Sequence, residues 1–225
     1  MEKKIKKILI IGDSNCLPRY NADTKNVITL EDTYIFNLKN KLKSCHFEQV
    51  TLGGISTSEL INHAIPYYVN WKPDILLLHT GINDTKSQFI KGRILNFFYK
   101  VFSFFNFSKK DIKSKILYNP FFLKYYSQTK TDIRVFENNV NKIKLLFNES
   151  KIFWLEIFSD ERIDDERPNT KKNIEKFNYS IKKVFGKNFI ELKELNERKY
   201  FTNDGYHLNK NGHTKLTNIL IELFN

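Results

Sequence analysis

Short apolar runs alternate along the chain with segments in which apolar residues recur every three or four positions. The apolar runs predict β-strands at Lys7–Ile11, Phe47–Leu52, Ile75–Leu78, Lys151–Phe158 and Asn188–Leu192. The helical spacing predicts α-helices at Asp32–Leu42, Ser56–Trp71, Ile133–Phe147, Thr170–Phe185 and Lys210–Phe224. Alternation of this kind predicts an α/β fold in which about five parallel strands are covered by helices on both faces.

The length and composition suit one such domain, spanning residues 1–225. Hydrophobic residues make up 41% of the chain, enough for a packed core, and two cysteines exclude a disulfide scaffold. The apolar run after the basic N-terminus is too short for a secretion signal, and no stretch reaches the roughly 18–20 apolar residues of a membrane span. We therefore expect a cytoplasmic protein, with a position on the cytoplasmic face of a membrane left open.

One segment interrupts the alternation of strands and helices. Residues 86–130 stand where a strand-to-helix connection normally needs only a few residues, so they predict an inserted helical segment. Within it, Phe89–Tyr126 holds 13 of the 33 aromatic residues, with eight lysines and arginines and one acid. A helical hairpin packed on the core is the simplest interpretation. A lid over a pocket, a membrane-surface element and an interface for a partner or second subunit remain open.

The net charge of +12 is concentrated in two places. The inserted segment is one, and the other is Met1–Lys7, which has four lysines and one glutamate. The rest of the chain is close to neutral, and no motif typical of DNA or RNA binding is present. We expect no nucleic-acid partner.

Three polar clusters follow the first three predicted strands directly: Gly12–Asn15, Gly53–Thr57 and Gly81–Asp84. A fourth, Asp204–His207, precedes the last helix. The carboxyl ends of parallel strands meet at one edge of a sheet, which is where such folds bind ligands. We expect the four clusters to lie together at that edge.

Each cluster supplies a different part of an acyl-transfer site. The Ser14 hydroxyl can act as a nucleophile, His207 can accept its proton, and Asp204 can orient the imidazole. The side-chain amide of Asn83 can donate to an oxyanion, and a backbone N–H can approach the substrate closely at Gly54, which has no Cβ. Taken alone, Ser14 could instead be only a helix cap.

These clusters, read as GDS (12–14), GGIST (53–57), GIND (81–84) and DGYH (204–207), resemble the four blocks of the GDSL/SGNH hydrolases in order and spacing. The resemblance implies a flavodoxin-like, three-layer α/β/α fold and the transfer of an ester-linked acyl group without metal or cofactor. It implies a triad of Ser14, Asp204 and His207, with an oxyanion hole from Ser14, Gly54 and Asn83. Gly54 is preferred to Gly53 as the backbone donor of the oxyanion hole, on the GGxST spacing alone. Two features depart from the family pattern: Asn15 replaces the leucine of its name, and the insertion is not part of its minimal fold.

Further residues near the predicted site have weaker assignments. Asp13, Asn15 and Arg19 are candidate substrate contacts. Cys16 is expected to be a small buried side chain, and Asp84 to be structural. The remaining histidines are expected to be structural because they lack metal-ligand spacing, so no metal site is predicted: His46, His63, His79 and His213.

The sequence thus predicts a serine esterase that removes a short acyl group, such as acetyl, from a carbohydrate. Its expected partner is a small-molecule or glycan ester, and a peripheral membrane or oligomer contact through residues 89–126 remains open. Three alternatives remain: an O-acyltransferase acting on a cell-surface glycan precursor, a lipid or thioester hydrolase, and a non-catalytic binding module.

Overall fold

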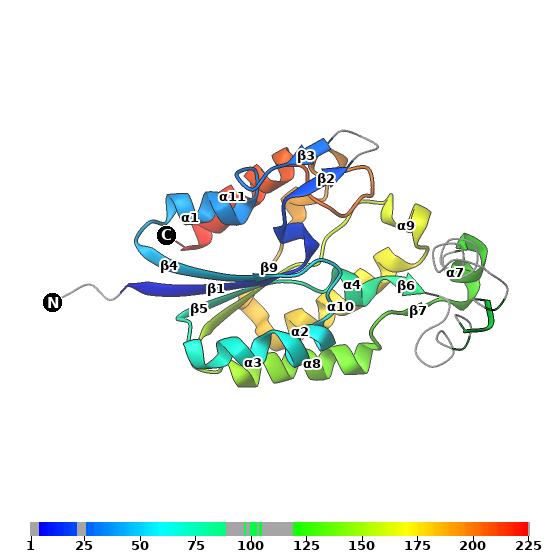
Figure 1. Ribbon diagram of the computed structural model, residues 1–225, viewed down its shortest axis with the longest axis horizontal. Coiled ribbons are helices and arrows are strands. Elements are labelled where there is room, and N and C mark those ends of the chain that lie inside the picture. The colour runs from blue at the N-terminus through cyan, green and yellow to red at the C-terminus, as the bar shows by residue number, and fades with distance from the viewer. Residues whose placement is uncertain are drawn as a thin grey trace.

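The computed structural model describes residues 5–21, 26–88, 97, 100–102, 104 and 119–224. Its centre is a parallel sheet in the order β4-β1-β5-β8-β9 (Figure 1). The strands are β1 (Lys6–Gly12), β4 (Cys45–Thr51), β5 (Ile75–His79), β8 (Lys151–Leu155) and β9 (Phe189–Ile190). The predicted α/β fold with five parallel strands is confirmed. The strand order reverses at β1, which places a ligand crevice outside its carboxyl end.

Helices cover both faces of the sheet (Figure 1). One face carries α1 (Tyr34–Lys41) and α11 (Lys210–Phe224). The other carries α2 (Thr57–His63), α3 (Ile65–Tyr68), α8 (Ile133–Leu146) and α10 (Thr170–Phe185). The residues of β1 divide between the two cores: Ile8 and Ile10 belong to the first, and Leu9 and Ile11 to the second. Because a parallel strand is buried on both faces, its sequence is a continuous apolar run.

Several short elements have no counterpart in the prediction. The antiparallel strands β2 (Arg19–Asn21) and β3 (Asn26–Ile28) follow the first turn, and α4 (Ile82–Thr85) and α9 (Ile163–Glu166) follow β5 and β8. Three-ten turns occur at Ser14–Cys16, Val69–Trp71, Gly186–Asn188, Lys193–Leu195 and Arg198–Tyr200. Elements of three or four residues are too short to show a hydrophobic period.

Two predicted boundaries are wrong. The single helix expected over Ser56–Trp71 is broken after His63, because Pro66 in the first turn of α3 has no N–H to continue the hydrogen-bond ladder. The strand expected over Lys151–Phe158 ends at Leu155. Beyond it, the backbone N–H and C=O of Ile157 pair with the side-chain amide of Asn178, each at 2.8 Å.

The base of the insertion predicted at residues 86–130 is a short antiparallel pair. β6 (Ser87–Gln88) pairs with β7 (Gln128–Thr129), and α7 (Pro120–Tyr126) precedes β7. The side-chain amide of Asn169 donates to the carbonyl oxygens of Leu123 and Lys124 at 3.4 and 3.2 Å, which docks α7 against the start of α10.

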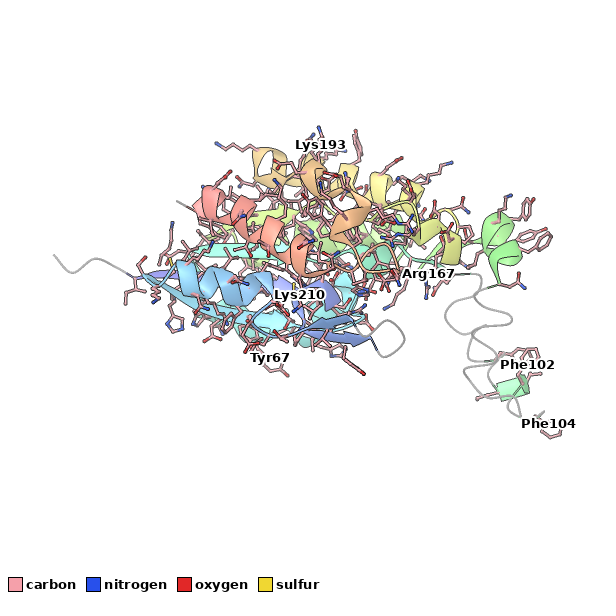
Figure 2. All side chains as sticks on the ribbon, turned by 90° about the horizontal axis from the view of Figure 1, so that it is seen from above. Tyr67, Phe102, Phe104, Arg167, Lys193 and Lys210 are labelled. Carbon is pink, nitrogen blue, oxygen red and sulfur yellow. The ribbon has the colours of Figure 1, made fainter. Side chains whose placement is uncertain are left out.

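Most of the predicted aromatic, basic segment lies outside the described residues, namely 89–96, 98–99, 103 and 105–118. Phe102 and Phe104 lie beyond α7, away from the sheet (Figure 2). Of the helices in the described part of the chain, none is both long enough and apolar enough to cross a bilayer.

Candidate active site

Ser14 stands at the sharp turn that follows β1. Gly12 ends the strand, and a Cβ there would overlap the Cys16 side chain, so this turn requires glycine. The Asp13 carboxylate accepts a hydrogen bond from the N–H of Asn15 at 3.0 Å and caps the three-ten turn that Ser14 opens. The turn therefore presents the serine at the carboxyl end of the sheet.

His207 lies between Ser14 and Asp204. Its Nε2 is 2.8 Å from Ser14 Oγ, and its Nδ1 is 2.6 Å from Asp204 Oδ2. Asp204 is held in turn by its other oxygen, which accepts from the Thr202 hydroxyl at 2.9 Å and from the N–H of His207 at 3.0 Å. An Nδ1–H donated to Asp204 leaves the Nε2 lone pair to accept the serine proton.

Two hydrogen bonds hold the loop that carries Asp204 and His207, one to the loop that carries Ser14 and one to the segment after β8. The Asn15 side-chain oxygen accepts from the N–H of Leu208 at 3.1 Å, although 193 residues separate them in sequence. The N–H of Asp160, after β8, donates to the carbonyl oxygen of Gly205 at 2.7 Å. The serine loop and the histidine loop are thus fixed against each other and against the sheet.

Burial and neighbouring charges set the protonation states of the triad. Burial lowers the pKa of His207 to about 4; the Asp204 carboxylate opposes this shift, and Arg19 and Lys86 add to it. For Asp204 burial acts to raise the pKa, but hydrogen bonds from His207 and Tyr206 hold the net pKa well below its usual range. At neutral pH the pair is a neutral imidazole beside a carboxylate, the state a general base requires.

The structure places Arg19 beside the triad. Its Nη1 lies 3.2 Å from Asp204 Oδ2 and 2.5 Å from His207 Nδ1. An Nδ1 that donates to Asp204 cannot also accept from a guanidinium, so the carboxylate is the acceptor for Arg19. Its side chain is 31% exposed, and its predicted contact with substrate stays a prediction.

The other two candidate substrate contacts hold the loops, and their predicted contact with substrate stays a prediction. Asp13 and Asn15 are 1% and 4% exposed, and their side chains accept the backbone hydrogen bonds described above. Burial raises the pKa of Asp13 to about 7. The predicted burial of Cys16 is confirmed, and His79 is buried as well. Burial raises the pKa of the Cys16 thiol, so Cys16 is unsuited to act as a thiolate nucleophile.

Asn83 and Asp84 connect the third cluster to the second. The Asn83 amide donates to the carbonyl oxygen of Ile55 at 3.1 Å, which uses one of its two N–H groups. Asp84 is fully buried and accepts from both the N–H and the hydroxyl of Thr57, at 3.0 and 2.8 Å. The structural role expected for Asp84 is confirmed.

Gly54 lies in the loop between β4 and α2 with a φ of +74°, a conformation that favours glycine. Its carbonyl oxygen accepts from Lys130 Nζ at 3.1 Å, and the same ammonium lies 3.2 Å from the Glu59 carboxylate. Lys130 directly follows β7, so the base of the insertion touches the loop that carries the candidate oxyanion donor.

Lys86 and Tyr206 are neighbours of the site that the sequence reasoning missed. Lys86 Nζ lies 3.1 Å from Asn83 Oδ1 and 4.0 Å from the centre of the Tyr206 ring. The ring of Tyr206 packs against His207 with a centroid separation of 4.0 Å. No sequence signal marked the lysine, because α4 is too short to show a helical period and Lys86 directly follows its last residue.

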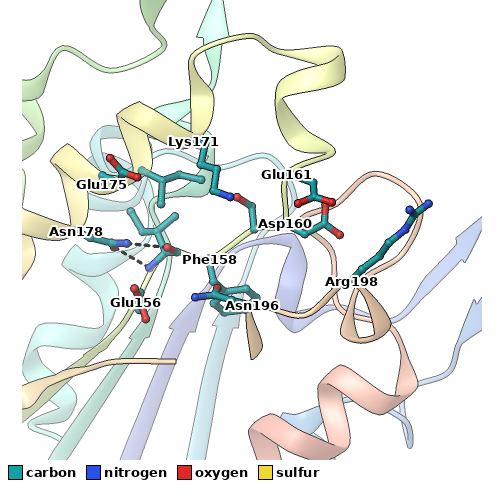
Figure 3. Close-up of a pocket in the computed structure, with 12 residues that line it drawn as sticks. Glu156, Phe158, Asp160, Glu161, Lys171, Glu175, Asn178, Asn196 and Arg198 are labelled. Carbon is teal, nitrogen blue, oxygen red and sulfur yellow. Dashed lines mark hydrogen bonds between the residues drawn. The ribbon is translucent and has the colours of Figure 1, made fainter. Parts of the chain in front are cut away.

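A pocket of about 300 Å³ opens where β8 ends, between α10 and the segment containing Asn196 and Arg198 (Figure 3). Its lining is rich in charged and amide side chains, among them Asp160, Lys171 and Asn178. Asp160 also touches the histidine loop through Gly205, so the pocket borders the loop that carries Asp204 and His207.

Known structures share this fold across nearly the whole chain. A lipase/acylhydrolase from Enterococcus faecalis is 14% identical, with a TM-score of 0.64 over 97% of this chain and 94% of the other. The acetyl xylan esterase AlAXEase is 18% identical, with a TM-score of 0.61 over 96% and 98%. A GDSL-like lipase from Bacteroides thetaiotaomicron is 11% identical, with a TM-score of 0.59 over 97% and 87%.

At these identities the likeness shows a common fold and not a common activity. No protein-family model matches the chain, and no curated protein matches it by sequence. The arrangement of the side chains at the sheet edge therefore has to carry the functional argument.

Proposed function

We propose that this chain is a serine hydrolase of the GDSL/SGNH type, which transfers an acyl group from an ester to Ser14 and then to water. The observation that carries the proposal is the hydrogen-bonded series from Ser14 Oγ through His207 to Asp204, with distances of 2.8 and 2.6 Å. A structural cap or a satisfied core histidine has no need of all three groups in this order. The common fold with esterases and acylhydrolases supports the same assignment.

In the first half-reaction, Ser14 Oγ attacks the ester carbonyl carbon while its proton passes to His207 Nε2. The carbonyl electron pair moves to oxygen, and the N–H groups of Ser14 and Gly54 and the amide of Asn83 stabilise the oxyanion. Collapse of this tetrahedral species breaks the bond to the alcohol, which leaves with the proton from His207. An acyl-serine remains.

In the second half-reaction, water attacks the acyl-serine and gives its proton to His207. Collapse of the second oxyanion returns that proton to Ser14 and releases the acid. The partly buried Asp204 carboxylate stabilises the imidazolium in both steps and holds the imidazole in the required tautomer. The negative charge of the oxyanion raises the pKa of His207 while the oxyanion is present, so the imidazole can hold the proton during that step.

We further propose that the ester is a short acyl group, such as acetyl, on a carbohydrate. The charged and amide lining of the pocket after β8 suits hydroxyl-rich ligands better than a long acyl chain. β8 lies two strands from β1, and at about 4.8 Å per strand the two carboxyl ends are roughly 10 Å apart, within reach of one or two sugar rings. A sugar hydroxyl in place of water would make the same site an O-acyltransferase.

We propose separately that residues 89–126 contact a membrane surface or a second subunit. The support for this proposal is a set of exposed aromatic side chains among the described residues: Phe97, Phe104, Phe121, Tyr125 and Tyr126. Aromatic residues mixed with lysines suit either an anionic membrane surface or a second subunit. Binding to anionic vesicles, compared with sedimentation of the protein alone, distinguishes the two.

Ser14→Ala tests the proposed function. The purified wild-type protein should react covalently with a fluorophosphonate probe and release p-nitrophenol from p-nitrophenyl acetate. The variant should do neither, since the Ser14 hydroxyl is the group that is hydrogen-bonded to His207 Nε2. Mass spectrometry of the labelled peptide locates the adduct.

Labelling that survives in Ser14→Ala contradicts the nucleophile assignment. A wild-type protein that neither labels nor hydrolyses any short-chain ester supports the binding-module alternative. Comparison of acetylated xylo-oligosaccharides with long-chain esters and thioesters then tests the substrate class, and acetyl transfer to a sugar faster than to water identifies a transferase.

A further inference from the structure

Lys86 occupies a position next to the oxyanion donors that the mechanism above does not use. It follows the short helix α4, three residues after Asn83, and its ammonium donates to Asn83 Oδ1 at 3.1 Å. On its other side the ammonium lies over the Tyr206 ring, 4.0 Å from the ring centre. The side chain is partly buried, so these contacts replace much of its hydration.

The contact with Lys86 decides which way the Asn83 amide faces. An ammonium can only donate, so it requires the amide oxygen on its side. The carbonyl oxygen of Ile55 can only accept, so it requires the amide nitrogen, at 3.1 Å. Rotation of the amide by 180° would place donor against donor and acceptor against acceptor. Only the observed orientation satisfies both partners, so the two contacts fix the side on which the Asn83 N–H groups lie.

Charged groups around Lys86 come from four other parts of the chain. Arg167 and Arg19 repel it, while Asp13 and Asp204 attract it. Burial is the largest influence, and together these lower the pKa of Lys86 to about 8. The lysine is therefore still mostly cationic at neutral pH and donates to Asn83 Oδ1 as an ammonium.

We propose that Lys86 is a positioning residue that fixes the Asn83 amide for oxyanion stabilisation. This inference rests on the proposed function, because it assigns Lys86 to the same reaction.

The test compares Lys86→Met, which removes the donor and the charge, with Lys86→Arg, which keeps both. Lys39→Met is the matched control: Lys39 also donates to a side-chain amide oxygen, that of Gln49 at 2.8 Å, and burial lowers its pKa too, but it lies on α1 against β4. The readouts are kcat and KM for p-nitrophenyl acetate, the rate of fluorophosphonate labelling at Ser14, and the melting temperature.

Loss of an oxyanion donor costs roughly 10²–10³ in kcat, so loss of its orienting partner should cost roughly tenfold or more, with KM changed less than about threefold. Lys86→Arg should restore most of the rate, and Lys39→Met should match the wild type. In an Asn83→Ala background, Lys86→Met should lower kcat by less than about twofold, because the amide that it orients is gone.

Three results overturn the inference. The first is a Lys86→Met variant that keeps the wild-type kcat. The second is a loss of kcat by the same factor with and without Asn83. The third is a loss of activity in both Lys86 variants that only matches a lost folded fraction. A Lys86→Gln variant repeats the test if the methionine variant does not fold. An active, labelled wild type with any of these results refutes only the role of Lys86, whereas an inactive, unlabelled wild type refutes the proposed function as well.

Discussion

Asn83 and His207 each have two chemically different ends, and their neighbours decide which end faces the proposed reaction. Asp204 takes the Nδ1 side of His207 and leaves Nε2 to Ser14. Ile55 and Lys86 take opposite ends of the Asn83 amide. In both cases the functional atom is set by the partner of the other atom, which is how a protein selects a tautomer or an amide orientation.

Arg19 provides a prediction at the residue scale. Its guanidinium lowers the pKa of His207, after the larger effect of burial, and shares Asp204 with it. The base must be neutral to accept a proton, so kcat/KM should fall as the pH drops through the His207 pKa, about 4. Arg19→Gln removes the repulsion and should move this acid limb to higher pH.

The measurement is kcat/KM for a short-chain ester across the acid range. Arg134→Gln, which removes an arginine from the start of α8, is the control for a general loss of positive charge and should leave the limb in place. An unchanged limb in Arg19→Gln would show that Arg19 does not act on His207.

At the scale of elements, the candidate oxyanion site depends on how α4 is joined to α2. Asp84 in α4 accepts two hydrogen bonds from Thr57, the first residue of α2, and Thr57 in turn accepts from the Asn139 amide of α8 at 3.0 Å. Asp84 and Thr57 are both fully buried. This network fixes Asn83 relative to the loop that contains Gly54.

Asp84→Ala should therefore destabilise the protein and slow the reaction. It leaves the N–H of Thr57 buried without its acceptor, at a cost of about 1–3 kcal/mol, and frees Asn83 to shift. Urea unfolding measures the loss of stability, and kcat measured where the variant is fully folded gives the catalytic loss. Asp84→Asn, which keeps an acceptor oxygen, should lose less in both. Equal losses in the two variants would contradict the argument.

At the scale of the whole molecule, buried ionisable groups couple folding to pH. Burial lowers the pKa of His79 to about 3 and of His207 and His213 to about 4. Each histidine is therefore protonated at a higher pH in the unfolded chain than in the folded one. Burial raises the pKa of Asp13 to about 7 and of Asp84 to about 6, with the opposite effect. Near pH 5 the three histidines are protonated mainly in the unfolded chain, and the two aspartates mainly in the folded chain. At these five groups the unfolded chain therefore binds about one more proton than the folded chain.

One excess proton in the unfolded state makes stability fall by about 1.4 kcal/mol for each pH unit of acidification. We expect this slope between about pH 5 and about pH 6, where the unfolded histidines are protonated and the folded ones are not. Free energies of urea unfolding at several pH values measure it. His213→Gln removes one histidine and should bring the slope close to zero. A wild-type protein that gains stability on acidification in this range would contradict the pKa assignments.

The positions of the main strands and helices could be predicted because their signals are local. Ile8 to Ile11 form an apolar run, and Ile174, Phe177 and Ile181 recur at helical spacing, whatever packs against them. The break at Pro66 and the end of β8 were missed, because apolar content continues through both. At the second, the side chain of Asn178, 21 residues away, takes the hydrogen bonds of Ile157.

The sequence by itself determined the fold class, the order of the main strands and helices and the five candidate residues of the site, because periodicity and short motifs are written in neighbouring positions. Only the tertiary structure decided which groups surround them. Arg19 meets Asp204 across 185 residues, and Lys86 meets Tyr206 from a different loop. Such pairs depend on how loops from separate strands pack at one edge of the sheet, and that packing sets the charge, burial and orientation of every group in the site.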